Sequence, residues 1–306
     1  MSEATMTKAT GTASTTAAAT TASATDPAAA TSAVGHRRTG ARTRRALSAV
    51  GSLWLLAALL VAWEIVARLS PSVFFPPFSV VLGQFGQDWF AARPQTLFAS
   101  DRFLESVPVS LSRLARGWLL AAVLGVAIGV VLGRSRVARH LYSPVIRFWM
   151  SVPNAALLPI ALQFFGITEA MNIFLITFGS MWLIAVNTAD GVAGVDPSWL
   201  RAARSMRLPR PVLYLRVILP AAAPHILAGL RISLGFGLIL MIVAELYATT
   251  AGLGHDVALY QQTFRYREMW SAFLLIALIG IALNAAVDLL ERRLLRWQRR
   301  TGLASL

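Results

Sequence analysis

Long runs of apolar residues dominate the chain and alternate with short polar segments. Six of these runs, each about 20 residues long, have the length that a helix needs to cross about 30 Å of hydrocarbon. They cover about Leu47–Ala67, Val109–Leu132, Tyr142–Phe165, Met171–Ala189, Ala221–Tyr247 and Met269–Leu290. In the long segment between the first two runs, the pattern predicts a short amphipathic helix over Ser79–Trp89. The pattern as a whole predicts an all-α polytopic transmembrane helical bundle with about six spans.

The composition supports this interpretation and excludes several kinds of chemistry. Apolar residues make up 56% of the chain and charged residues 14%, too few for the surface of a soluble domain. The absence of cysteine excludes disulfides, thiolate catalysis and Cys-ligated metals. The 4 histidines lie far apart with no HExxH spacing, so we expect no metal site. Lys8 is the only lysine and lies in the N-terminal tail, so the chain cannot form a Gly-Lys-Ser/Thr phosphate-binding loop.

The distribution of residue types divides the chain into three parts. Residues 1–46 are rich in Ala, Thr and Ser and end in a basic cluster, so we expect a disordered tail. Residues 47–300 form the expected transmembrane domain, which includes a polar loop over about residues 190–220. Residues 301–306 form a short C-terminal tail.

The arginines indicate the orientation of the spans. With six spans, the dense clusters fall on one side of the membrane, and they are Arg37–Arg45, Arg134–Arg139, Arg201–Arg216 and Arg292–Arg300. Arginine-rich loops face the cytoplasm, so we expect both termini inside the cell. Arg113 and Arg116 lie at the opposite end of the second span, where we expect them to reach lipid headgroups. The net charge of +14 thus fits membrane topology better than nucleic-acid binding.

The polar loop before the fifth span carries strong helix signals. Asp196 supplies an N-cap oxygen, and Pro197 suits the first helical position. We expect a short helix over Ser198–Met206 and a second one from Pro211 to Pro220. Two short helices in one loop form either a compact docking projection or a hairpin that rests on anionic lipid through its arginines.

At this loop the sequence resembles a known family. Arg201-Ala202-Ala203, then Arg207, then Ile218-Leu219-Pro220 are similar to the EAA loop of binding-protein-dependent ABC importer permeases. Three stretches resemble the branch for nitrate, aliphatic sulfonates and taurine, and they start at Ser151-Val152-Pro153, Ile218-Leu219-Pro220 and Ala244-Glu245-Leu246. The resemblance covers about residues 47–300.

The resemblance implies a role for the loop and raises one question. In the family, this loop forms a coupling helix that sits in a groove of a cytoplasmic ATPase. The corresponding positions here are Asp196, Trp199, Arg201, Ala202, Ala203, Arg204, Arg207 and Pro220. The family usually has glutamate at position 201 and glycine at position 207, where this chain has Arg201 and Arg207. Glycine suits a helix end in the left-handed conformation, which is costly for a residue with a β-carbon.

Polar residues and prolines within the spans are candidates for a translocation path. They are Pro153, Asn154, Pro159, Asn187, Arg231, Ser233 and Glu245. A proline in a span frees backbone carbonyls, which are satisfied either at a wet cavity or by packed neighbours. Arg231 either extends to the inner surface or faces the cavity and offers a charge to an anion. Glu245 either caps its helix or lies near the outer gate.

The resemblance therefore implies the permease subunit of an ATP-driven importer for a small, anionic solute such as a sulfonate, nitrate or taurine. It is a transport subunit and no enzyme, because Mg-ATP belongs to the partner ATPase. Its expected partners are two ATPase subunits, a second permease copy or a paralogue, an extracytoplasmic substrate-binding protein and the bacterial plasma membrane. The alternatives are an ion-gradient-driven transporter or channel, which predicts inverted repeats and paired carboxylates, and a membrane-embedded enzyme, which needs a catalytic cluster.

Overall fold

Helices provide the regular structure of this protein, in agreement with the fold class that the sequence predicts. The computed structural model describes residues 54–90 and 100–295, which contain an isolated β-bridge between Ser72 and Phe75 and no β-strand. The chain divides into two units, residues 1–61 and 62–306. Residues 54–61 of the first unit are helical, and all that follows concerns the second. The predicted tails, 1–46 and 301–306, and the start of the first predicted span lie outside the described residues.

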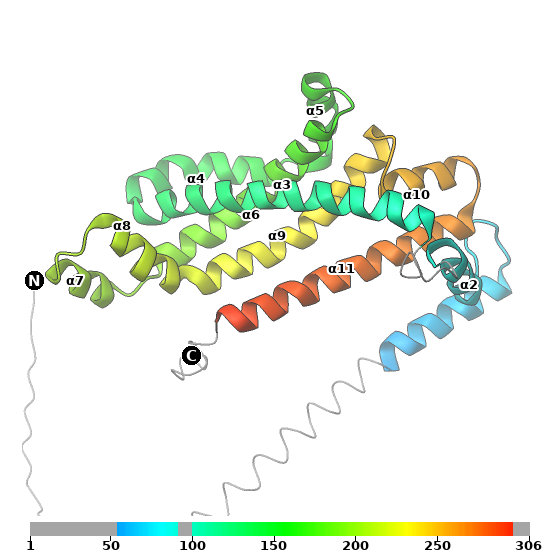
Figure 1. Ribbon diagram of the computed structural model, residues 1–306, viewed down its shortest axis with the longest axis horizontal. Coiled ribbons are helices and arrows are strands. Elements are labelled where there is room, and N and C mark those ends of the chain that lie inside the picture. Colours follow the sequence, from blue (N-terminus) through cyan, green and yellow to red (C-terminus); the bar gives the residue numbers. More distant parts are fainter. Residues whose placement is uncertain (1–53, 91–99, 296–306) are drawn as a thin grey trace, which may run out of the picture. The chain divides into compact units, whose positions relative to one another are not determined.

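The helices of the second unit follow one another along the chain (Figure 1). They are α2 (Phe78–Trp89), α3 (Asp101–Arg134), α4 (Arg136–Ser151), α5 (Leu158–Phe165), α6 (Glu169–Ala193), α7 (Pro197–Ser205), α8 (Arg210–Leu213), α9 (Leu219–Ala248), α10 (Leu253–Gln262) and α11 (Tyr266–Leu294). A 3₁₀ turn, Asn154–Leu157, precedes α5, and a π-helical turn, Tyr214–Ile218, joins α8 to α9. The α2 helix confirms the amphipathic helix predicted over Ser79–Trp89.

Four helical segments in the described residues are long and apolar enough to cross a membrane. They are Asp101–Arg134, Glu169–Ala193, Arg210–Ala248 and Tyr266–Leu294, and each contains one predicted span. The third predicted span, about Tyr142–Phe165, is interrupted at its prolines, because α4 and the segment Asn154–Phe165 meet at 88° and form a broken span or a re-entrant loop. Pro153 explains the break, since it has no N–H to donate and disfavours helical geometry at Val152 before it.

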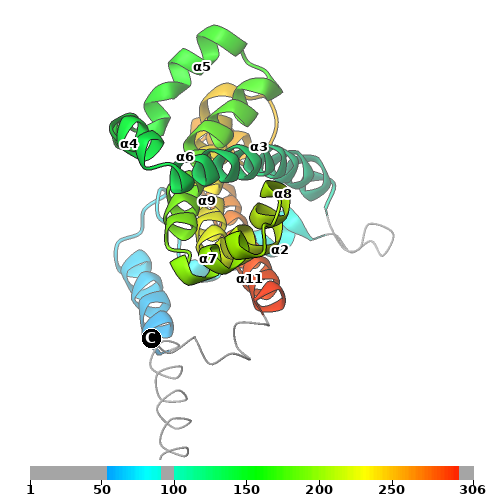
Figure 2. The same cartoon turned by 90° about the vertical axis from the view of Figure 1, so that its left-hand side faces the viewer.

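Glycines bring α3 and α6 into direct backbone contact. A β-carbon added at Gly129 would lie 2.6 Å from the Ala185 carbonyl oxygen, and the same close approach recurs along α3 at Gly117, Gly125 and Gly133. Small residues at four-residue intervals let membrane helices approach closely. Seen from the end that carries α7, α3, α6 and α9 lie side by side (Figure 2). These three helices form the scaffold on which the candidate site is built.

Candidate functional site

The loop between α6 and α9 begins with a capped helix, as the sequence predicts. The Asp196 carboxylate accepts hydrogen bonds from the Ser198 backbone N–H at 2.7 Å and from its hydroxyl at 2.6 Å. These bonds favour the ionised form, so they hold the pKa of the exposed Asp196 carboxyl below its ordinary value. Pro197 occupies the first turn of α7, where a missing N–H has no consequence. The start of α7 is therefore specified locally.

The end of α7 requires a left-handed residue, and Arg207 occupies that position. Arg207 has φ of 51°, in the region that glycine adopts without penalty. The Leu208 N–H donates to the Ala203 carbonyl at 3.2 Å, which closes the last turn as in a Schellman motif. Position 207 thus keeps the left-handed backbone conformation that suits the glycine usual in the family, and the β-carbon of Arg207 makes this conformation strained.

The side chains of α7 divide into an exposed set and one buried residue. Trp199, Arg201, Ala202 and Arg204 are exposed, whereas Ala203 is only 2% exposed. Ala203 therefore does not belong to an outer docking face, in contrast to the role assigned to it from the sequence. Its side chain faces inward because it lies on the side of the helix that packs against the rest of the loop.

The second half of the loop is continuous with α9, which corrects the predicted helix end at Pro220. The segment Arg210–Ala248 runs as one helix through the π-helical turn. In that turn the Leu219 N–H donates to the Tyr214 carbonyl, and Pro220 lies in the first turn of α9. A widened turn accommodates a proline because the hydrogen-bond ladder is already interrupted there. Pro220 is thus part of a rigid connection between the loop and a span.

The candidate path residues near the α4–α5 break lie beside α6. Pro153 and Pro159 are exposed on the two sides of the 3₁₀ turn. A β-carbon added at Gly179 would lie 3.3 Å from Asn154 Cγ, so Asn154 packs directly on α6. The Asn154 Oδ1 atom is buried and has no hydrogen-bond partner among the described residues. A buried polar atom of this kind favours a site for water or a ligand over a purely packed kink.

Asn187 and Ser233 have local partners within the helix pack. The Asn187 side chain donates to the Leu183 carbonyl at 2.8 Å, on its own helix, and its Cβ lies next to Gly229. Ser233 is fully buried, accepts a hydrogen bond from Trp118 Nε1 at 3.0 Å and donates to its own helix. Both residues therefore have structural roles in joining α9 to α6 and α3.

Arg231 forms ion pairs with α11. Its guanidinium lies 2.6 Å from an Asp288 oxygen and 3.5 Å from a Glu291 oxygen. Such pairing offsets the penalty of placing a cation within a membrane helix. The sequence predicted that Arg231 extends to the inner surface or offers an open charge in the cavity. Neither prediction included these carboxylate partners.

Glu245 lies near the end of α9 and is the centre of a buried polar network. That end of α9 lies next to α10, away from α7 (Figure 1). The Glu245 carboxylate is fully buried and accepts hydrogen bonds from Ser110 Oγ at 2.8 Å, Arg113 at 2.9 Å and the Gly254 N–H at 3.0 Å. Gly252 is required beside it, since its φ is 120° and a β-carbon there would meet the carboxylate at 2.5 Å. The network joins α3 to the end of α9 and the start of α10.

Arg113 extends this network to α6 and does not reach lipid headgroups as predicted. It is 5% exposed, pairs with Glu169 as well as Glu245, and donates to the Ala251 carbonyl at 2.6 Å. Arg116, which is exposed, also donates to Glu169, at 3.1 Å. Sequence reasoning missed Arg113 and Glu169 as partners. An arginine inside an otherwise apolar span is the signal that points to such a partner.

The candidate path residues therefore do not gather at one place. Those near Asn154 and Asn187 lie along α6, Arg231 faces α11, and Glu245 closes the end near α10. Within residues 54–90 and 100–295, no three His, Cys, Asp or Glu side chains come close enough to hold a metal ion. The structure is a helix scaffold that carries the α6–α9 loop at one end. At the other end it carries the ion-paired network of Glu245, Arg113 and Glu169, which we call the charged clasp.

Comparisons with known proteins agree with this arrangement. The family described as the binding-protein-dependent transport system inner membrane component matches residues 121–300. The aliphatic sulfonates transport permease protein SsuC of Bacillus subtilis (strain 168) is 30% identical over 249 residues, which are 80% of this chain and 87% of that protein. The taurine transport system permease protein TauC of Escherichia coli (strain K12) is 34% identical over 249 residues, 80% of this chain and 89% of that protein.

A solved structure shows the same fold. It is that of a bacterial alginate ABC transporter in complex with an alginate pentasaccharide-bound periplasmic protein. One of its chains matches with a TM-score of 0.56 and 16% identity, over 78% of this chain and 94% of that chain. The residues that match the family, 121–300, contain α6, α9 and the loop between them. This chain therefore belongs to the family of binding-protein-dependent transport system inner membrane components, and it is a multi-pass membrane permease subunit of an ABC importer rather than an enzyme.

Proposed function

We propose that this permease imports a small anion of the sulfonate class, with α7 docked on ATPase subunits in the cytoplasm. The α6–α9 loop carries the proposal. It is capped at Asp196, closed at Arg207, and presents Trp199, Arg201 and Ala202 to the outside of the subunit. A short, internally bonded helix with an exposed aromatic anchor suits insertion into a groove on a partner. Docking is favoured over a lipid-bound hairpin because the loop resembles the family's coupling loop.

The rigid connection from the loop to α9 supports mechanical coupling. The loop packs on the scaffold through an apolar cluster that includes Val192, Val195, Ile218 and Ala222. Because α8 continues into α9, a displacement of α7 by the ATPase moves the inner end of α9 with it. The charged clasp at Glu245 and Arg113 holds the other end of α9 to α3. Motion of the loop therefore moves the inner end of α9 relative to its outer end.

The charge distribution and the named relatives support an anionic solute. Arginines concentrate at the α7 end, where Arg134, Arg136, Arg201, Arg204 and Arg210 are found. Positive charge at this cytoplasmic end creates a potential that favours an anion arriving there from the α10 end. SsuC and TauC are described as permeases for aliphatic sulfonates and for taurine. A sulfonate is a compact oxyanion, so we assign this class of solute to the chain.

The rest of the proposed assembly is inferred from the missing phosphate-binding loop and from the α7 and α10 ends of the helix scaffold. With Lys8 as its only lysine it has no phosphate-binding loop, so Mg-ATP is held by two partner ATPase subunits. A second copy or a paralogue completes the path, and an extracytoplasmic binding protein delivers the solute at the α10 end. The arginine-rich α7 end faces the cytoplasm of a bacterial cell, with both termini on that side.

The test is purification of the complex from its native cell in mild detergent, followed by quantification of co-purifying proteins. We expect a stoichiometric ATPase with wild type, reduced recovery with Ala202→Asp, and unchanged recovery with Arg293→Gln, which makes the same change of charge on α11. Ala202 is the better probe than the buried Ala203, because a charge at Ala203 would disrupt the loop itself. Uptake that needs no ATPase and collapses with an ionophore would refute the proposal in favour of gradient-driven transport.

A further inference from the structure

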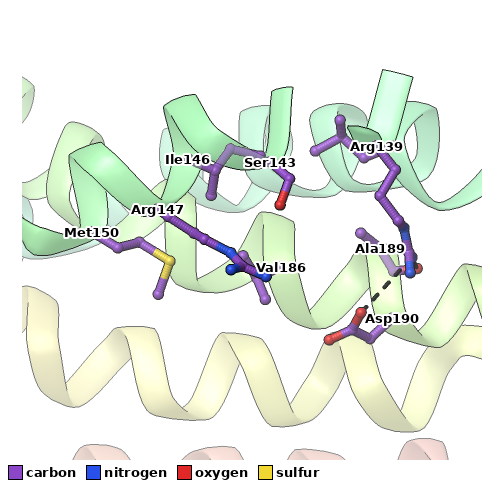
Figure 3. Close-up of a pocket in the computed structure, with 9 residues that line it drawn as sticks. Arg139, Ser143, Ile146, Arg147, Met150, Val186, Ala189 and Asp190 are labelled. Carbon is purple, nitrogen blue, oxygen red and sulfur yellow. Dashed lines mark hydrogen bonds and ion pairs between the residues drawn. The ribbon is translucent and has the colours of Figure 1, made fainter. Parts of the chain in front are cut away.

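A cavity between α4 and α6 has arginine, serine and aspartate side chains in its wall (Figure 3). Its volume is about 290 Å³. Arg139, Ser143 and Arg147 line it from α4, and Val186, Ala189 and Asp190 line it from α6. The three α4 residues are spaced by four, so they share one face of the helix. Sequence reasoning did not single out Arg147.

The opposite face of α4 is apolar and exposed. Val137, Leu141, Val145 and Phe148 are each at least 46% exposed. An amphipathic helix in a membrane turns its apolar face to lipid and its polar face to protein or water. The stripe that contains Arg139 and Arg147 therefore lies on the side of α4 that borders the cavity, where Arg147 is exposed and the Arg139 side chain is 40% exposed. Along a helix these two arginines are separated by about 12 Å.

The two arginines differ in their partners. Arg139 donates to the Ala189 carbonyl at 2.7 Å, and its guanidinium lies 3.8 Å from an Asp190 oxygen (Figure 3). The Arg147 side chain points across the cavity toward Val186 (Figure 3). Its guanidinium has no hydrogen-bond or ion-pair partner within residues 54–90 and 100–295. Arg147 is exposed beside the cavity, so its guanidinium is free to donate charge-assisted hydrogen bonds to an anion that enters it.

A second cavity continues this one toward the α7 end. It has a volume of about 510 Å³ and shares Leu132 and Arg139 with the first. Arg134, Arg136 and His140 also line it, together with Pro197 and Leu200 of the loop. Arginines thus follow α4 from the loop to Arg147, and Asp190 is the acidic residue in the lining of the two cavities.

We propose that the α4 cavity is an oxyanion-binding site in which Arg139 and Arg147 bind a sulfonate or phosphate group between α4 and α6. Arginine suits this task because its planar guanidinium offers two parallel donors to an oxyanion. Ser143, between the two arginines on the same face, adds a hydroxyl donor. The assignment of the transported solute as occupant rests on the proposed import function, and the alternative source of the same chemistry is an anionic lipid headgroup.

The experiment measures equilibrium binding of radiolabelled methanesulfonate to the purified complex in phosphatidylcholine nanodiscs. We expect saturable binding that weakens about tenfold or more in Arg147→Gln and Arg139→Gln, the effect of losing one charge-assisted hydrogen bond. Asp190→Asn should strengthen binding, because it removes the carboxylate beside the site. Arg293→Gln, on α11 outside the cavity, should leave binding unchanged, and Arg147→Lys should retain most of it.

Three results separate the outcomes. Equal binding in Arg147→Gln and Arg293→Gln would overturn the site. If phosphatidylglycerol in the nanodisc competes with methanesulfonate in wild type, and is retained by wild type but lost from Arg147→Gln, the site stands with a lipid as its occupant. If neither probe binds while the ATPase still co-purifies, the oxyanion site fails and the proposed import function survives. Size-exclusion profiles identify any variant that fails to fold.

Discussion

Replacing Arg207 with glycine should stabilise the α6–α9 loop. Arg207 has φ of 51°, and a residue with a β-carbon loses about 1–2 kcal/mol in this left-handed conformation. Glycine removes that strain. Its greater conformational freedom in the unfolded chain costs about 0.5–1 kcal/mol, which offsets part of the stabilisation. The Arg207 side chain is exposed and forms no ion pair within the described residues, so little is lost with it. The net gain should be about 1 kcal/mol.

Amide hydrogen exchange, followed by mass spectrometry of the permease in nanodiscs, measures this gain directly. The Leu208 N–H is bonded to the Ala203 carbonyl only while the last turn is closed, so its exchange rate reports the opening of the loop. A gain of about 1 kcal/mol slows exchange about fivefold. The peptide that contains residues 200–210 should show this slowing, and peptides from α3 should show none.

Two further variants separate backbone strain from charge. Arg207→Ala removes the charge but keeps a β-carbon, so it should leave the exchange rate close to that of wild type. Arg207→Asn, which tolerates the left-handed region better than most residues, should give an intermediate rate. Equal slowing in the glycine and alanine variants would refute the reasoning, because it would assign the effect to the lost positive charge.

Three further predictions concern the scaffold, the clasp and the cap. Gly129→Val should lower stability by about 1–3 kcal/mol or more in thermal unfolding, because its β-carbon would lie 2.5 Å from Thr188 Cβ. Arg113→Met should lower stability by about 3–5 kcal/mol, because it leaves the buried Glu245 carboxylate without its cation, and adding Glu245→Gln should restore part of that loss. The pKa of Asp196 is lowered in the folded loop by its hydrogen bonds, so its capping contribution is present above about pH 3.9, the ordinary value, and is lost as the pH falls through the lowered pKa. Hydrogen exchange of α7 measured against pH checks this, and Asp196→Asn should remove that pH dependence.

Each of these predictions has a control in the same chain. Gly235→Ala should be tolerated, since nothing lies within 4 Å of a β-carbon there, and equal loss at both glycines would contradict the packing argument. If Arg113→Met unfolds at the temperature of wild type, the clasp has no net effect on stability. Exchange in α7 that accelerates with falling pH in both wild type and Asp196→Asn would assign the effect to another group.

Local signals account for the parts of the fold that the sequence predicted well. Apolar runs of about 20 residues identified the spans because the bilayer sets their length. Asp196 followed by Pro197 identified the start of α7, since an N-cap acts within three residues of itself. The requirement for a left-handed residue at position 207 was likewise readable from the family's glycine, and the structure places φ of 51° there.

Partners across long separations could not be read in this way. Arg113 and Glu245 are 132 residues apart, and only the packing of α3 against the end of α9 brings their charges together. The inward direction of Ala203 and the continuity through Pro220 depend on how the loop folds back on α6. Pro153 explains the bend at Val152 locally, but the cavity that Arg147 lines depends on the position of α4 beside α6.

The sequence by itself therefore determined four of the segments that are long and apolar enough to cross a membrane, where the loop helix begins and to which family the chain belongs. These depend on composition and on contacts between near neighbours. The tertiary structure alone decided which charges are paired, which alanine is buried and which arginine faces a cavity. A charge within a membrane helix is stable only beside a partner, and the sequence shows the charge while the packing of distant helices selects that partner.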